Sequence, residues 1–180
     1  LPRTRNDAHK LIEECMLLAN VAAAEYALQH DVPMLYRIHE PPEFSRIQKV
    51  RDFVKLLGLP FPEQPTQKDY QAVIDATKDR IDAPSIHAVL LRSMMQAYYG
   101  PNNAGHFGLA YEAYTHFTSP IRRYPDLLLH RALQAKLKHK PAPLSGAALD
   151  DAGQHFSATE RRADEASRSV TTWLKCHYMQ

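Results

Sequence analysis

The 180-residue sequence predicts a predominantly helical α+β fold. Most of its length falls into segments whose apolar residues recur at helical spacing, enough for five or six helices. Two segments, residues 34–39 and 106–117, have strand character, and the second alternates apolar with small or polar side chains. The length suits one domain, or a large piece of one, with a core of its own.

The first predicted helix runs from a cap at Asn6 or Asp7 to about Gln29. Residues 15–24 are apolar almost all round, which predicts burial on most sides of the helix. One face at helical spacing carries Leu11, Cys15, Leu18, Ala22 and Tyr26. The short strand at 34–39 follows and ends at a Pro-rich turn.

The central part of the chain alternates helices with loops. Residues 44–57 have a helical pattern that stops at Gly58, a residue favoured just beyond helix ends. The Pro-rich stretch 59–67 is predicted to be a loop. Two shorter helices are then predicted, near 69–77 and 84–99.

The segment from 106 onward changes period, from a strand to a helix. Three side chains of the predicted strand should face the core: Phe107, Leu109 and Phe117. Thr118-Ser119-Pro120 is typical of a helix start, with a hydroxyl cap and proline at the first helical position. This helix is predicted to run from Pro120 to about Lys140.

A linker and one more helix complete the predicted elements. Residues 140–148 are expected to be the linker. Ser157-Ala158-Thr159-Glu160 has the form of a capping box, which predicts that the last helix begins there. One stripe of that helix carries Ala163, Ala166, Val170, Trp173 and His177.

Twin arginines just after the Ser-Pro step suggest a phosphate-binding corner. A cation in the first turn of a helix opposes the helix dipole, so Arg122 and Arg123 are poorly placed for helix stability alone. They are well placed if an anion sits there, where free backbone N–H groups also point. The structural alternative is that one arginine is exposed while the other pairs with Asp126.

The remaining polar candidates are weaker. Glu13 and Glu14 are best interpreted as surface carboxylates near a helix start, although Glu14 borders the apolar face, where a buried carboxylate would need a cationic partner. The histidines show no metal-site spacing in a credible constellation. Asp150 and Asp151 resemble a magnesium pair but lack a third carboxylate, so solvated charge is the favoured interpretation.

Composition narrows the class of protein. The net charge of +2 argues neither for nor against a nucleic-acid partner, so any basic surface must be local. The two cysteines are far apart and fit reduced thiols in the cytoplasm, and no segment is apolar enough to cross a membrane. The chain lacks an initiator Met and ends inside a helical pattern, so we expect a fragment of a longer protein.

Several stretches together resemble one enzyme family. The segments 106–110 (HFGLA) and 114–127 (YTHFTSPIRRYPDL) are similar to the distinctive motif of the ribonuclease II superfamily. Residues 11–20 resemble the helix that opens the second half of that family's RNB catalytic domain. Residues 163–166 and 173–176 resemble its closing helix, in the style of the bacterial ribonuclease R branch. The resemblance spans nearly the whole chain.

The resemblance implies that residues 1–180 are the C-terminal half of one RNB catalytic domain, whose sheet is completed by the upstream half. Such enzymes are processive 3′→5′ exoribonucleases that hydrolyse single-stranded RNA to nucleoside 5′-monophosphates with Mg²⁺. The family's metal-binding aspartates lie upstream and do not occur here, so we expect this chain alone to be inactive.

The resemblance also implies roles for individual residues. The family's active-site arginine corresponds to Arg122, and its supporting glutamate to Glu13 or Glu14, between which the sequence does not decide. The RNA channel is expected to include further polar residues: Arg123, His106, Thr118, Ser119 and Tyr124. The competing hypothesis is a non-catalytic helical RNA-binding module, whose arginine corner grips phosphates without chemistry.

Overall fold

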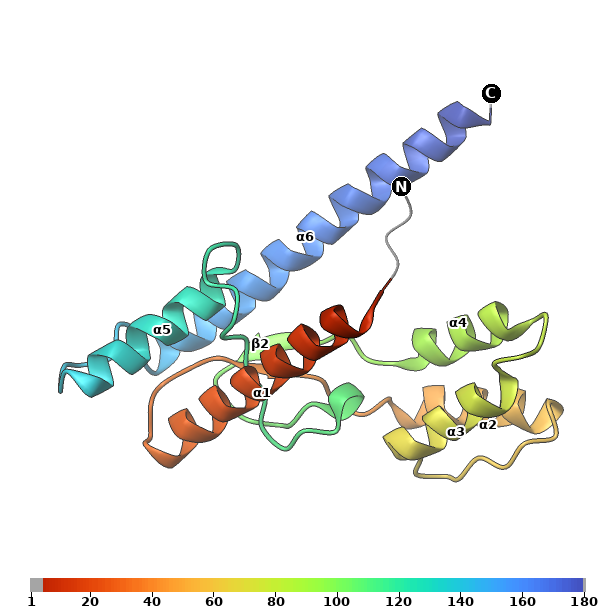
Figure 1. The fold of residues 1–180 in the computed structure, drawn as a ribbon, viewed down its shortest axis with the longest axis horizontal. Coiled ribbons are helices and arrows are strands. Elements are labelled where there is room, and N and C mark those ends of the chain that lie inside the picture. Colours follow the sequence, from red (N-terminus) through yellow and green to blue (C-terminus); the bar gives the residue numbers. More distant parts are fainter. Residues whose placement is uncertain (1–4, 180) are drawn as a thin grey trace. The chain divides into compact units, whose positions relative to one another are not determined.

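The computed structural model describes residues 5–179 and divides the chain into two compact units (Figure 1). The first unit comprises the described residues up to Ile38, together with Tyr98–Asn103 and those from Ala113 onward. The second comprises His39–Ala97 and Ala104–Glu112. Helices account for 61% of the described residues, which also contain two strands, so the predicted helical α+β class is confirmed.

The first unit packs three helices around a small sheet. Its elements are α1 (Asp7–Gln29), β1 (Tyr36–Ile38), β2 (Tyr98–Gly100), α5 (Tyr124–Leu137) and α6 (Ala147–Tyr178). The two strands pair antiparallel, with Tyr36 opposite Gly100 and Ile38 opposite Tyr98. As predicted, α1 begins at an Asn6 cap, whose side chain accepts the His9 N–H.

The core of this unit uses the small side chains of α1. Ala23, Ala24 and Ala27 are buried against residues of β1 and α5. The predicted apolar face of α1 is wrong, because its residues are exposed: Leu11, Cys15, Leu18, Ala22 and Tyr26. The polar residue of the run, Asn20, does not mark the outer side, because it is itself buried, and the face that packs against residues of β1 and α5 is the one with the alanines.

The close approach of α6 to β2 is set by two small residues. A Cβ at Gly153 would lie 2.8 Å from the Tyr99 carbonyl oxygen, so only glycine fits there. One turn later, the buried Ser157 hydroxyl accepts the Tyr99 N–H at 2.9 Å and donates to the Gly153 carbonyl at 2.8 Å. The predicted helix start at Ser157 is therefore wrong, since α6 already begins at Ala147 and Ser157 serves its packing.

The C-terminal half of α6 extends beyond the rest of its unit (Figure 1). All described residues from 161 onward are exposed, including the whole predicted stripe from Ala163 to His177. Trp173 and His177 stack on each other, with ring centroids 5.7 Å apart.

The second unit is a small helical body with its own core. It contains α2 (Phe44–Leu56), α3 (Gln67–Thr77), α4 (Ala83–Ser93) and the 3₁₀ helix η1 (Phe107–Leu109). Its buried cluster consists of Val50, Val54, Tyr70, Val73 and Leu90. The helix predicted over 84–99 is too long, because α4 ends at Ser93 and residues 98–100 form β2.

The strand predicted over 106–117 is wrong. Only isolated bridges occur there, at His106 and Tyr111, and η1 lies between them. Leu109 is exposed, while Phe107 and Phe117 are half-buried. A strand needs a neighbouring strand for its backbone hydrogen bonds. Here β1 and β2 pair with each other, and side chains accept N–H groups of this segment instead: His39 accepts that of Gly108 and Asn20 that of Phe117.

The predicted helix start at Thr118-Ser119-Pro120 is also wrong. Ser119 opens a separate turn, whose carbonyl accepts the N–H groups of Arg122 and Arg123, and α5 begins only at Tyr124. Pro125 takes the place in the first turn that was expected for Pro120. The arginines therefore precede α5 rather than lie within it.

The α6–β2 contact gives a stability prediction. Ser157→Ala leaves the buried Tyr99 N–H without an acceptor, so the free energy of unfolding should fall by about 1–3 kcal/mol. The matched control is Ser167→Ala on the exposed part of α6, where the hydroxyl bonds only the Ala163 carbonyl. Thermal or urea unfolding should show a change within about 0.5 kcal/mol for the control. Equal effects of both changes would contradict this view of the contact.

Candidate functional site

The segment 117–123 carries the arginine pair on a turn held by buried polar side chains. From α1, Asn20 Oδ1 accepts the N–H groups of Phe117 at 2.9 Å and Thr118 at 3.2 Å. The amide nitrogen of Asn20 donates to the Tyr114 hydroxyl at 2.9 Å. Asn20 is itself buried, so the start of the turn is tied firmly to α1.

Asp126 on α5 ties the middle of the same turn. Its side chain is fully buried, and Oδ1 accepts both the Ser119 N–H and the Arg123 Nη2 at 2.8 Å. A buried carboxylate is stable only when charge and hydrogen bonds compensate its lost hydration. Arg123 therefore forms an ion pair with Asp126. This matches the alternative in which one arginine is exposed and the other pairs with Asp126.

His130 anchors the turn from one turn further along α5. Its Nε2 donates to the Phe117 carbonyl at 2.9 Å, and its ring stacks on Phe117 with centroids 4.2 Å apart and planes 4° apart. Three side chains from two helices thus fix this backbone. The fixed turn presents Ile121 and Arg122 outward, and Arg122 takes part in no ion pair of residues 5–179.

A pocket of about 400 Å³ opens beside the arginine turn, within the first unit. Arg122, Arg123 and Tyr124 line one side, while Thr159 and Glu160 of α6 lie among the residues of the other. Buried polar atoms of Arg123, Asp126 and Thr118 find no hydrogen-bond partner among the described residues: Nε, Oδ2 and Oγ1 respectively. The site thus combines an unpaired cation with unsatisfied buried polar atoms.

A charged network behind this pocket was missed by the sequence analysis. Arg37 of β1 contacts Glu160 of α6 at 2.6 Å, and its guanidinium lies 4.7 Å from the centroid of the Tyr99 ring. The Tyr99 hydroxyl shares a hydrogen bond of 2.8 Å with His116 Nδ1. Burial raises the pKa of Tyr99 to about 12, so the phenol stays neutral. No spacing signal links these four residues, which are distant in sequence.

The structure brings most of the predicted phosphate-binding residues together. Arg122, Arg123 and Tyr124 line the same pocket, and Thr118 and Ser119 lie on the turn before them. Thr118 and Ser119 contribute their backbone N–H groups to Asn20 and Asp126. The Arg131 guanidinium lies over the ring of Tyr124, 5.8 Å from the ring centroid.

The two glutamates lie on the exposed N-terminal half of α1. Glu13 forms an ion pair with Arg5, and no hydrogen bond or ion pair of the described residues joins Glu13 or Glu14 to Arg122. Glu13 precedes Asn20 by seven residues, which places it on the same helix face about 10 Å away. Glu14 is rotated off that face.

His106 belongs to the second unit, whereas the arginine turn belongs to the first. Its Nδ1 accepts the Leu109 N–H at 3.2 Å and caps η1. The buried His39, which the sequence analysis missed, holds this loop: Nδ1 accepts the Gly108 N–H and Nε2 donates to the Met95 carbonyl, both at 2.7 Å. A Cβ at Gly108 would lie 2.9 Å from His39 Nδ1, which explains the glycine.

No group of three or more His, Cys, Asp or Glu residues within 5–179 could hold a metal ion. None of the helices in that range is long and apolar enough to span a bilayer.

Comparison with known proteins decides the family. A family model described as the RNB domain matches residues 1–139. The chain belongs to the RNB domain family. It is 47% identical to Ribonuclease R of Escherichia coli (strain K12) over 188 residues, which cover 97% of this chain and 23% of that protein. The chain therefore spans about a quarter of this relative, and α6 lies beyond the matched RNB residues.

Solved structures show the same RNB fold in two kinds of protein. Mycoplasma genitalium RNase R in complex with ribose methylated single-stranded RNA matches with a TM-score of 0.85 and 27% identity, over 96% of this chain and 28% of that one. Yeast Ssd1, described as a pseudonuclease, matches with a TM-score of 0.73 and 26% identity, over 85% and 20%. The fold alone therefore does not establish activity.

The buried carboxylate gives a second stability prediction. Asp126→Ala leaves Arg123 and the Ser119 N–H without their acceptor, so the free energy of unfolding should fall by about 3–5 kcal/mol. Glu63→Ala is the control, because Glu63 pairs with Arg51 while 77% of its side chain is exposed. Its loss should cost at most about 1 kcal/mol. Chemical denaturation measures both, and a similar small cost for Asp126→Ala would show that it does not anchor the turn.

Proposed function

We propose that this chain is part of a processive 3′→5′ exoribonuclease that hydrolyses single-stranded RNA to nucleoside 5′-monophosphates. One observation carries the proposal: an unpaired arginine, Arg122, is held at a pocket on a turn fixed by buried side chains. The sequence match to proteins named Ribonuclease R supports the same activity. The proposal also includes a cytoplasmic location, which the free thiols of Cys15 and Cys176 fit.

Arg122 is assigned to the phosphate of the bond that is cleaved. Negative charge on the phosphate oxygens grows as the bond to the leaving group breaks, and a fixed guanidinium stabilises that charge without reorganising. The planar guanidinium can donate to two oxygens at once, which a lysine cannot. Because Asp126 already neutralises Arg123, that second arginine positions the turn rather than adding a free charge.

Glu13 is the better candidate for the supporting carboxylate. It shares the α1 face of Asn20, the residue that holds Phe117 and Thr118, whereas Glu14 points away from that face. Thr118, Ser119 and Tyr124 are proposed to line the path of the RNA, and His106 is proposed separately as an RNA-contacting residue of the second unit.

Magnesium is proposed as the cofactor of the whole enzyme, with ligands outside this chain. The described residues themselves do not fit a metal site, because they contain no suitable group of three ligands. We accordingly propose that residues 1–180 form the C-terminal half of a catalytic domain and need its upstream half. The roles assigned to Arg122 and Glu13 involve no step through the metal.

The alternative is a non-catalytic RNA-binding module, and one observation favours it: the fold also occurs in a protein described as a pseudonuclease. In that case the arginine turn would hold RNA phosphates without cleavage. The two functions differ in what happens to bound RNA, so assays of cleavage and binding on the same substrate separate them.

The 180-residue chain alone should not cleave RNA. The reason is the lack of a three-ligand metal group in residues 5–179. The test incubates the purified chain with end-labelled single-stranded RNA and Mg²⁺, beside the full-length protein as the positive control. Metal-dependent, stepwise shortening from the 3′ end by the chain alone would refute the proposal that the metal ligands lie elsewhere.

In the full-length protein, Arg122→Ala should slow cleavage far more than it weakens RNA binding. Loss of one preorganised donor to the transition state costs about 3 kcal/mol, or roughly a hundredfold in rate. Other phosphate contacts supply the affinity, which should change little. Arg122→Lys should restore activity only in part.

Single-turnover cleavage and equilibrium binding on the same RNA measure the two effects. Arg162→Ala is the control, because Arg162 is exposed on α6 and does not line the arginine pocket. If Arg122→Ala weakened binding as much as it slowed cleavage, Arg122 would be a positioning contact. If the unmodified full-length protein bound RNA without cleaving it, the RNA-binding module would be favoured.

A further inference from the structure

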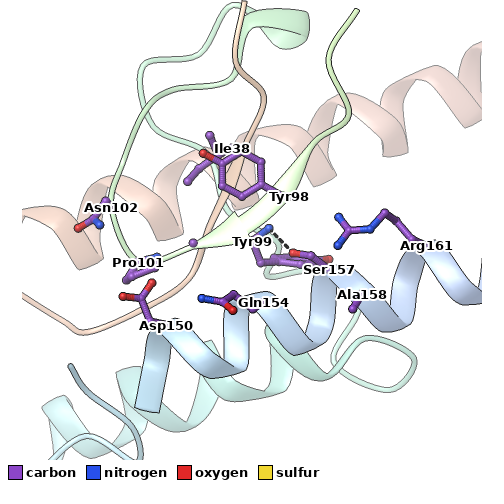
Figure 2. A pocket seen from close by; sticks show the side chains of 11 residues that line it. Ile38, Tyr98, Tyr99, Pro101, Asn102, Asp150, Gln154, Ser157, Ala158 and Arg161 are labelled. Atoms are coloured by element: carbon purple, nitrogen blue, oxygen red, sulfur yellow. Dashed lines mark hydrogen bonds between the residues drawn. The ribbon is translucent and has the colours of Figure 1, made fainter. Parts of the chain in front are cut away.

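A second pocket lies on the opposite flank of the α6–β2 contact from the arginine turn. Its volume is about 570 Å³, within the range of pockets that hold small organic ligands. Tyr99 lines both pockets, but Arg122 and Arg123 line only the first. Figure 2 shows Asp150, Gln154 and Arg161 projecting from one face of α6 toward β2, with Tyr98 on the other side.

The charges of this pocket stand at its two ends and are not used elsewhere. Asp150 and Arg161 are eleven residues apart on α6, so about 16 Å separates their positions along the helix axis. That separation prevents a direct ion pair between them. Neither takes part in an ion pair with any residue of 5–179. Both charges are therefore available to a ligand that spans the pocket.

The middle of the pocket offers a ring and two amides. The half-buried Tyr98 ring lies on the β2 side, and the carboxamides of Gln154 and Asn102 are exposed nearby. An aromatic face accepts a flat heterocycle by stacking, and carboxamides donate and accept hydrogen bonds along its edge. The combination fits a ligand with a planar polar ring and a separate anionic group.

Two other ligand classes fit less well. A metal ion would find one carboxylate, since Asp150 is the acidic residue among those lining the pocket. A peptide strand cannot pair with β2 at Tyr99, because Ser157 already accepts the Tyr99 N–H (Figure 2). A nucleotide can stack its base on the ring, hydrogen-bond to the amides and place its phosphate beside the cation.

We propose that this pocket binds a guanine nucleotide, with the base on Tyr98, its N–H donors on Asp150 and its phosphate on Arg161. Guanine alone among the common bases carries two adjacent N–H donors, N1–H and the 2-amino group, beside a carbonyl on one edge. A carboxylate accepts both donors, and the Gln154 or Asn102 amide donates to the carbonyl. The Arg161 guanidinium pairs with phosphate oxygens.

This inference rests on the proposed function for its ligand source, because RNA and the mononucleotides released from it both supply guanine nucleotides. The shared chemistry is a guanine base with a 5′-phosphate. Competition distinguishes the sources: if free GMP displaces a short RNA with an unpaired guanine from the chain, one site takes both. If RNA binding is unaffected by GMP, the pocket takes the free nucleotide.

The test titrates the 180-residue chain with GMP, AMP, CMP, UMP and inorganic phosphate by calorimetry. GMP should bind about tenfold more tightly than the other nucleotides. Asp150→Asn puts an NH₂ donor against guanine's own donors and should remove that preference. Arg161→Gln should weaken GMP about tenfold while leaving guanosine, which has no phosphate, unchanged.

The neighbouring residues provide matched controls. Asp151→Asn and Arg162→Gln change the same charges on exposed positions of the same helix that do not line the pocket. Both should bind GMP like the unmodified chain, and circular dichroism should show the same helix content in all variants. Equal binding of the four nucleotides, no binding of GMP, or equal effects of Asp150→Asn and Asp151→Asn would overturn the inference.

The outcome is separable from that of the exoribonuclease proposal. Nucleotide binding to the chain requires no cleavage, so failure to bind GMP leaves the role of Arg122 untouched. Conversely, an Arg122→Ala enzyme that cleaves normally contradicts the proposed function while the pocket on the other flank of α6 still binds GMP.

Discussion

The buried carboxylate of Asp126 is the constraint on which the candidate site depends. A fully buried charge must be compensated, and Asp126 takes its compensation from the Ser119 N–H and the Arg123 guanidinium. That requirement bends the chain into a turn before α5 begins. It also pairs Arg123 with Asp126, so Arg122 is the arginine that stays unpaired at the pocket. Asn20 and His130 reinforce the same turn from α1 and α5.

A second constraint, the close approach of α6 to β2, arranges both pockets of the first unit. Gly153 and Ser157 let the helix lie against the Tyr99 backbone, and the side chains on either flank then line separate hollows. The Arg37–Glu160 pair closes the contact on the side of the arginine turn. Packing of small residues therefore determines where the charged ones gather, which links the stability of the fold to the geometry of the sites.

The sequence predicted the helical class, the family, and the start and end of α1, because long periodic segments, a good cap and a dense motif are strong local signals. It failed where tertiary structure overrides local pattern. Alternation at 106–117 suggested a strand, yet the side chains of His39 and Asn20 bind N–H groups of that backbone instead. The Arg37–Glu160 contact joins residues 123 positions apart, which no spacing argument reaches. The roles of Arg122 and Glu13 remain predictions.

The most direct test of the account is a double-mutant cycle between Asp126 and Arg122 in the full-length protein, read as single-turnover cleavage rates. If Asp126 acts by holding the turn that presents Arg122, then Asp126→Asn should slow cleavage on its own. The same change should cause little further loss once Arg122 is alanine, giving a coupling energy of about 1–3 kcal/mol. Losses that simply multiply would contradict the account, because Asp126 would then act independently of Arg122.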